Sequence, residues 1–123
     1  MPAWMGPWSA SERIDESSRV NYGSHMIDIR TTTIYSRWFE GLRDRQAKAR
    51  IVVRVRRLQH GNPGQHRVLT GGVVEMKIDF GPGYRVYFTR RGDELLLLLI
   101  GGDKSSQQQD IETAQALAKE WQA

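Results

Sequence analysis

The sequence predicts an α+β domain in which a small antiparallel sheet packs against helices, in the element order β-α-α-β-β-β-α. Three patterns indicate this architecture. Apolar and polar residues alternate over 27–31 and 73–90, which is typical of strands with one buried face. Apolar residues recur at helical spacing over 35–58 and 111–121. The unbroken apolar run 95–100 predicts a central strand that is covered on both faces.

The N-terminal segment is predicted to lie outside this domain. Residues 1–22 lack sustained periodicity, and Gly23-Ser24-His25-Met26 resembles the scar that a protease-cleavable tag leaves behind. We therefore interpret residues 1–25 as a vector-derived, disordered extension and residues 26–123 as a single domain. A natural flexible arm is the alternative reading of the extension.

Composition narrows the classes of protein to consider. The chain has a formal net charge of +4, a sequence pI near 9.8 and no cysteine. Without cysteine, a disulfide scaffold and a cysteine-ligated metal site are excluded, and a reducing compartment is favoured. No apolar stretch approaches the roughly 20 residues that a membrane span needs, so we expect a cytoplasmic protein without a membrane partner. The positive charge favours nucleic acid or an acidic protein as partner.

Two helices are predicted after the first strand, and a third closes the chain. Thr33 can cap the first helix, and the second ends near Leu58, before a loop at 61–64. Asp103 or Ser105 can cap the last helix. The aromatic residues of the first helix are interpreted as core and not as a platform for stacking bases. The predicted core positions of the helices are Tyr35, Trp38, Phe39, Leu42, Ala47, Ile51, Val55, Leu58, Ile111, Ala114, Leu117, Ala118 and Trp121.

The second helix carries many basic residues that acidic neighbours barely oppose. Arg50, Arg54 and Arg57 are predicted to contact RNA phosphates, and His66, at the start of a short strand, could assist them. A solvated helix face is the alternative, and the residues support both readings equally. His60 and His66 flank a loop that offers no carboxylates at ligand spacing, so no metal site and no cofactor are predicted.

A hairpin at 73–90, with its turn at 81–83, supplies the candidate catalytic residues. Side chains alternate across a strand, and antiparallel partners share a face. A set of polar residues is therefore predicted to share an open sheet face, and it comprises Glu75, Lys77, Asp79, Arg85, Tyr87 and Thr89. Lys104 follows Gly101-Gly102 and could reach the same patch.

Lys77, Arg85 and Lys104 suit cleavage of RNA by its own 2′-hydroxyl. That reaction needs the hydroxyl to lose a proton, the phosphorane to be stabilised and the leaving oxygen to gain a proton. Arginine holds a phosphate through bidentate hydrogen bonds, lysine can act as acid or base, and preorganised positive charge stabilises the transition state. The equally supported alternative is a solvated polar face on which Asp79 and Arg85 form an ordinary cross-strand ion pair.

Three segments carry a resemblance to a known family. They are Gly83-Tyr84-Arg85-Val86-Tyr87-Phe88, the leucine run that ends in Gly101-Gly102-Asp103-Lys104-Ser105, and 107–111 with Ala114. Together they resemble the RelE/ParE toxin superfamily, and its HigB-like branch of addiction module killer proteins most of all. The resemblance extends from Met26 to Trp121. It implies a RelE-like fold, with mRNA bound on the concave sheet face in the ribosomal A site.

The resemblance also implies roles for single residues. The arginine that holds the scissile phosphate falls on Arg85. The basic residue of the preceding strand falls on Lys77, and the basic residue after the glycine-rich strand end falls on Lys104.

In other positions the chain departs from the family. Several RelE-like enzymes have a second strand lysine where this chain has Glu75. Some use a C-terminal tyrosine or histidine, whereas this chain offers only Asp110 and Gln107 nearby. The general acid and base are therefore unassigned, and Tyr87 is a substitute candidate for one of them.

The expected function is that of a toxin from a bacterial type II toxin–antitoxin system. We expect a metal-independent, ribosome-dependent mRNA endoribonuclease that inhibits translation and arrests growth. The resemblance implies a neutralising antitoxin, by analogy a helix-turn-helix protein, and contact with operator DNA only through the complex of the two. The alternative is a ParE-like toxin that binds DNA gyrase without cleaving RNA, and a third reading is an interaction module without activity.

Overall fold

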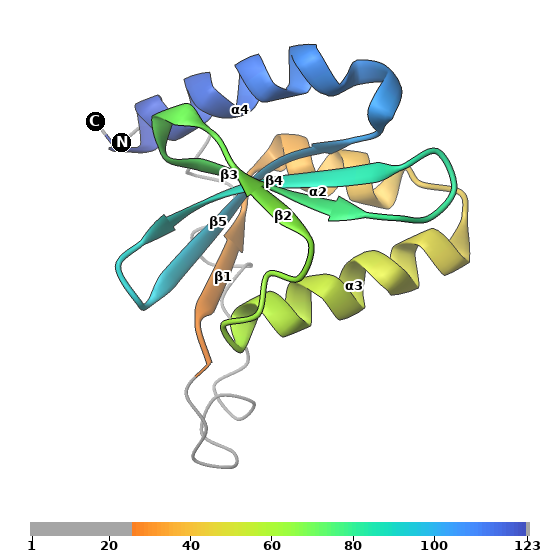
Figure 1. Cartoon of the computed structure of the whole chain (residues 1–123), viewed down its shortest axis with the longest axis horizontal. Coiled ribbons are helices and arrows are strands. Elements are labelled where there is room, and N and C mark those ends of the chain that lie inside the picture. The colour runs from red at the N-terminus through yellow and green to blue at the C-terminus, as the bar shows by residue number, and fades with distance from the viewer. Residues whose placement is uncertain (1–25, 123) are drawn as a thin grey trace.

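The structure, a computed structural model, describes residues 26–122, so our interpretation of residues 1–25 lies outside its range. Within that range a five-stranded sheet lies between helices (Figure 1). The elements are β1 (Asp28–Thr31), α2 (Thr33–Glu40), α3 (Arg45–Gln59), β2 (His66–Val68), the 3₁₀ turn η3 (Thr70–Gly72), β3 (Val73–Ile78), β4 (Tyr84–Arg91), β5 (Leu95–Gly102), the 3₁₀ turn η4 (Lys104–Ser106) and α4 (Gln107–Gln122).

The sheet is mixed, which corrects the prediction of an antiparallel sheet. Its strand order is β1-β5-β4-β3-β2, and β1 pairs with β5 in parallel while the other neighbours are antiparallel. The cause is tertiary: α2 and α3 carry the chain from β1 at one edge to β2 at the other edge. The meander from β2 to β5 then returns to β1 in the same direction. The short strand predicted to begin at His66 is confirmed as β2, and it adds one strand to the element order β-α-α-β-β-β-α.

The two faces of the sheet bury two separate hydrophobic clusters. Leu96 and Leu98 of β5 belong to the cluster beneath α2 and α3, whereas Leu97 and Leu99 belong to the cluster beneath α4. All four are at most 2% exposed, and burying a leucine side chain contributes roughly 1.5–3 kcal/mol. The prediction of a central strand covered on both faces is confirmed.

The helices bury the stripes that their spacing predicted, with one correction at a cap. The buried positions on α3 are Ala47, Ile51 and Leu58, and Trp121 ends the buried stripe of α4. The N-cap of α2 is Thr32 and not Thr33, because the Thr32 hydroxyl accepts the hydrogen bond from the Tyr35 amide. Thr32 also donates to the Leu99 carbonyl at 2.6 Å, which ties the start of α2 to β5.

Strand β5 ends in two glycines because a helix presses on each face at that point. A Cβ atom at Gly101 would overlap the ring of Trp38, on the side of α2. A Cβ atom at Gly102 would overlap the carboxylate of Asp110, on the side of α4. The Gly-Gly pair therefore allows α2 and α4 to approach the end of β5, next to the residues discussed below.

Candidate active site

The hairpin β3–β4 places the predicted polar residues on one face, with one exception. Lys77 pairs in register with Arg85, and Glu75 pairs with Tyr87, so these four side chains share the face that α4 covers. Asp79 is the exception, because β3 ends at Ile78 and Asp79 is exposed beside α3. The cross-strand pair between Asp79 and Arg85 is therefore wrong, and the ionic partner of Arg85 is Glu75.

The prediction that this face is open is also wrong. Helix α4 packs over it, and Glu75, Arg85 and Tyr87 are only 5%, 6% and 0% exposed. Period-two alternation identified the face correctly, but it carries no information on which face the last helix covers. The residues that remain accessible lie where α4 begins, and they are the half-buried Lys77 and the exposed Lys104.

The carboxylate of Glu75 is the centre of a buried polar cluster. Its Oε2 atom accepts hydrogen bonds from the Tyr87 hydroxyl and from Nε2 of Gln107, both at 2.9 Å. Nε of Arg85 lies 3.7 Å from the same oxygen, while Nη2 of Arg67 lies 3.1 Å from Oε1. Strands β2, β3 and β4 and helix α4 thus meet at one negative charge. A buried charge requires such partners, because an unpaired one costs several kcal/mol.

The guanidinium of Arg85 is fixed on two sides. Its Nη1 atom donates to the Gly83 carbonyl at 2.7 Å. Its Nε atom is buried without a hydrogen bond, since 3.7 Å to Glu75 is an ionic contact and too long for a hydrogen bond. The remaining nitrogen, Nη2, has no partner within residues 26–122.

Gly83 connects Arg85 to Lys104 across the open end of the cluster. It has a φ of 83°, which favours glycine, and a Cβ atom there would lie 3.2 Å from Nη1 of Arg85 and 3.7 Å from Cβ of Lys104. With Lys77 as the cross-strand neighbour of Arg85, the structure brings Lys77, Arg85 and Lys104 to one end of the sheet. These three cations form the candidate active site.

Two buried groups beside the cations have shifted acidities. Burial raises the pKa of the Tyr87 phenol, and its hydrogen bond to Glu75 raises it further. Burial also raises the pKa of Asp110, although the hydrogen bond from Ser106 at 2.6 Å opposes this effect. Tyr87 is enclosed, and its hydroxyl donates a hydrogen bond to Glu75, so it lacks the access to a substrate that its role as substitute acid or base requires.

Sequence reasoning missed the part that Glu75 and Gln107 play. Both had been noted only as departures from the residues found in relatives. The available signal was an acidic residue at the centre of a face otherwise rich in cations and phenol, which indicates a buried counter-charge. Asp110 was noted in the same way. The signal for its burial was Gly102, because a side chain at that position would overlap the Asp110 carboxylate.

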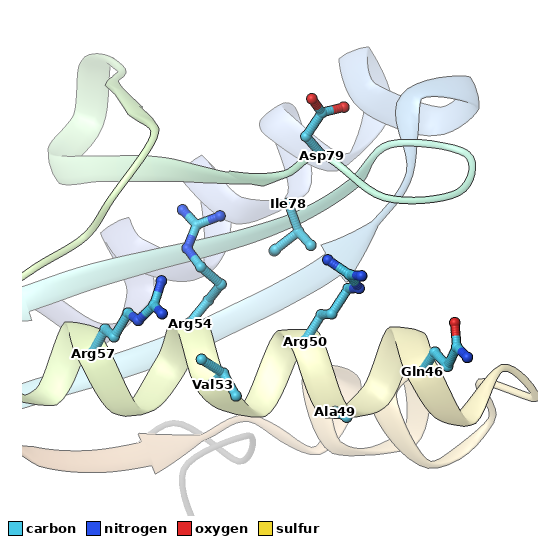
Figure 2. A pocket seen from close by; sticks show the side chains of 8 residues that line it. All are labelled: Gln46, Ala49, Arg50, Val53, Arg54, Arg57, Ile78 and Asp79. Carbon is cyan, nitrogen blue, oxygen red and sulfur yellow. The ribbon is translucent and has the colours of Figure 1, made fainter.

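The basic residues of α3 lie on the opposite face from Arg85. Arg50, Arg54 and Arg57 project from α3 beside a groove that also includes Ile78 and Asp79 (Figure 2). His66 is exposed at the edge strand β2, where its Nδ1 atom is 2.7 Å from the Gly64 carbonyl. The predicted catalytic and RNA-binding sets therefore do not form one continuous surface on the sheet, and RNA contacts by the α3 residues stay a prediction.

Within residues 26–122, no group of three or more histidine, cysteine or acidic side chains is arranged to hold a metal ion. In the same part of the chain no helix combines the length and the apolar character that crossing a membrane requires.

The fold and the site define a small α+β domain with three cations at one end of a hairpin and a buried carboxylate behind them. Residues 37–119 match the family described as Phage derived protein Gp49-like (DUF891), and the chain belongs to this family. The family is associated with toxin–antitoxin modules. The chain is also 45% identical, over 94 residues, to an uncharacterised protein of Haemophilus influenzae. That match covers 76% of this chain and 95% of the relative.

Proposed function

We infer that this protein is the toxin of a toxin–antitoxin module and that it cleaves mRNA on the ribosome. The observation that carries the proposal is the convergence of Lys77, Arg85 and Lys104 at one end of the sheet, with Arg85 fixed by Gly83 and Glu75. Charge that is already in place before the reaction costs no reorganisation in the transition state. A small antitoxin is the expected partner.

In the proposed reaction, the 2′-hydroxyl of one nucleotide attacks the adjacent phosphate, and the bond to the 5′-oxygen of the next nucleotide breaks. Nη2 of Arg85 is the guanidinium nitrogen left free for a phosphate oxygen. Lys77 and Lys104 flank the developing negative charge of the phosphorane. A proton leaves the attacking hydroxyl and a proton reaches the leaving oxygen, and the accessible lysines are the groups of this site that could exchange them.

Glu75 is a positioning residue in this proposal. It holds Arg85 by charge while Tyr87 and Gln107 fix the carboxylate itself. The Arg85 side chain, which would contact the phosphate, is therefore held in place by groups that do not themselves contact RNA. Support of this kind keeps a site within a few tenths of an ångström of its productive geometry.

The test is cleavage of ribosome-bound mRNA by purified Arg85→Lys protein, mapped by primer extension. The substitution keeps the positive charge but removes the fork that binds phosphate oxygens in pairs. We expect cleavage to fall on the order of 100-fold, as for the loss of one transition-state donor, and growth arrest to disappear. Arg90→Lys is the matched control, since Arg90 is exposed at the far end of β4. Wild-type cleavage by folded Arg85→Lys protein would refute the assignment.

The two lysines give an independent check of the same site. Lys77→Ala and Lys104→Ala should each slow cleavage, and the double substitution should cost less than the sum because groups that act as a unit are not additive. A gyrase supercoiling assay run in parallel distinguishes the RNase from the ParE-like, gyrase-binding alternative. Intact mRNA together with inhibited gyrase would exclude the RNase and support the gyrase-binding function.

A further inference from the structure

The outer surface of α3 combines positive charge with exposed apolar side chains. The helix carries six basic residues and no acidic one. Between the cations lie two valines, Val52 and Val53, whose exposed fractions are 43% and 47%. Repulsion among like charges disfavours an isolated solvated face, and covering Val52 and Val53 would remove apolar surface from water. A partner that supplies both acidic and apolar groups would therefore be favoured on this surface.

Two hollows lie along this surface, and Val53 and Arg57 line both. The larger has a volume of about 580 Å³ and lies between α3 and the end of β3, with Ala49, Val53 and Ile78 as its apolar lining (Figure 2). The smaller, of about 290 Å³, is lined by Val53, Arg56, Arg57, His60 and Asn62. Val53 is thus an apolar side chain shared by two hollows, each of which is also lined by arginines.

The arginines of this surface differ in what they already bind. The guanidinium of Arg54 donates to the carbonyls of Lys77, Pro63 and Gln65, so it forms a fixed part of the lining of the larger hollow. Arg50 covers the ring of Phe80, 4.3 Å from its centroid. No carboxylate within residues 26–122 pairs with either Arg50 or Arg57. Burial lowers the pKa of Arg54, and the nearby positive charge of Arg57 lowers it further.

These observations favour a polypeptide over RNA as the occupant. Single-stranded RNA binds by stacking its bases on aromatic side chains, but the ring beside the groove, Phe80, is already covered by Arg50. RNA gives no reason for exposed Val53, whereas protein interfaces centre on apolar contacts with charged residues at their rim. Carboxylates are the natural partners of the free guanidinium groups.

We propose that the outer face of α3 docks an acidic amphipathic helix of a partner protein. An apolar residue of that helix covers Val53, and its carboxylates pair with Arg50 and Arg57. These two arginines are seven positions apart, or about 10 Å along α3, so acidic residues at i and i+7 of the partner match them. If the proposed function holds, this helix belongs to the neutralising antitoxin. The surface itself does not depend on that function, because it lies on the opposite face from Arg85.

The probe is a designed, fluorescently labelled peptide of about 18 residues, which is five helical turns of about 3.6 residues each. It has glutamates at i and i+7 and leucines at i+3 and i+4. Its scrambled form has the same charge and no amphipathic face. Binding to the full chain is followed by fluorescence anisotropy at about 150 mM salt, where charges beyond roughly 8 Å are screened. Amide NMR shifts then locate the contact. A short single-stranded RNA competes in a separate arm.

We expect the amphipathic peptide to bind with shifts along α3, and the scrambled peptide to bind at least about tenfold more weakly, as for loss of one interface hot spot. Val53→Asp and Arg57→Glu should weaken binding by a similar factor. Arg37→Glu, an exposed change of equal charge on α2, should have little effect. Arg85→Lys protein should bind the peptide like the wild type even if it no longer cleaves RNA, which separates this proposal from the proposed function.

Other outcomes would overturn the proposal. Equal binding of the scrambled peptide would mean that the surface attracts negative charge without recognising an amphipathic helix. Shifts confined to the Lys77–Arg85 end would place the peptide on the other face. Displacement of the peptide by RNA, with both sets of shifts on α3, would assign the surface to nucleic acid. Val53 and Arg57 are exposed, so both variants should fold like the wild type, and their thermal melts check this.

Discussion

The two faces of the sheet use arginine in opposite ways. On the α4 face, Arg85 is 6% exposed and lies against the buried carboxylate of Glu75. On the α3 face, Arg57 is exposed and no carboxylate within residues 26–122 pairs with it. The first arginine has a fixed orientation before any ligand arrives, while the second must gain its partner from outside the domain. Both residues carry the same charge, so it is burial that separates an arginine with a fixed orientation from one that is available to a partner.

A third arginine, Arg54, shows that the face of the sheet does not by itself decide whether an arginine already has a partner. Arg54 belongs to α3, yet its guanidinium binds the carbonyls of the loop before β2 and of β3. It therefore joins α3 to the β2–β3 edge of the sheet. Of the arginines predicted to bind RNA, this one is already occupied by the protein itself.

The largest effect should come from breaking the α4-face cluster at its centre. Glu75→Gln keeps the shape but removes the charge that faces Arg85, and breaking a buried pair costs roughly 3–5 kcal/mol. Urea denaturation should show a loss of that order. Arg67→Gln removes the other ionic partner of Glu75, but its side chain is 57% exposed, so a loss below about 1 kcal/mol is expected. Equal losses for the two variants would mean that the Arg85 contact contributes no more than a surface pair.

A smaller effect should separate the two kinds of α3 arginine. Arg54→Ala removes three hydrogen bonds to carbonyls, although the Gln65 carbonyl keeps the bond from the Lys77 amide. We expect a loss of about 1–3 kcal/mol in the free energy of unfolding. Arg57→Ala removes an exposed side chain without such bonds and should change it by less than about 0.5 kcal/mol. Thermal or urea unfolding of the two proteins decides the matter. An Arg54→Ala protein as stable as Arg57→Ala would show that its hydrogen bonds are replaced by water at no cost.

The smallest effect concerns two carboxylates at the start of α4, whose pKa shifts have opposite signs. Burial raises the pKa of Asp110, so its charged form weakens the fold as pH rises above the unfolded value of about 3.9. Asp110→Asn should therefore melt higher than the wild type at pH 7, and the gain should shrink as pH falls towards about 4. The measurement is the melting temperature across that pH range.

Asp103 supplies the control with the reverse sign. Hydrogen bonds from Ser105 lower its pKa, so its charge stabilises the folded state at neutral pH, and that contribution is lost as pH falls through the lowered value. Asp103→Asn should melt lower than the wild type at pH 7 and approach it in acid. Identical pH dependence of the two variants would contradict the contrast between a buried and a hydrogen-bonded carboxylate.

Periodicity in the sequence determined most of the elements, the core and the face of the hairpin on which each side chain lies. The apolar run of β5 predicted burial on both faces, because five consecutive leucines and an isoleucine leave no polar side to expose. Alternation placed Glu75, Lys77, Arg85 and Tyr87 on one face, because a strand has a side-chain period of two. It did not determine the cross-strand pairing, in which the partner of Arg85 is Lys77 instead of Asp79. These features depend on neighbours a few residues away, so local pattern is enough to fix them.

Only the tertiary structure decided what each face meets. The apolar stripe of α4 showed that this helix packs on something, but a stripe does not name its partner, and α4 covers the face predicted to be open. In the same way the alternation of β1 predicted a strand, and the path of α2 and α3 made it parallel to β5. The enclosure of Tyr87 and the pairing of Glu75 with Arg85 follow from the position of α4. Such contacts join residues far apart in the chain, and no local period encodes them.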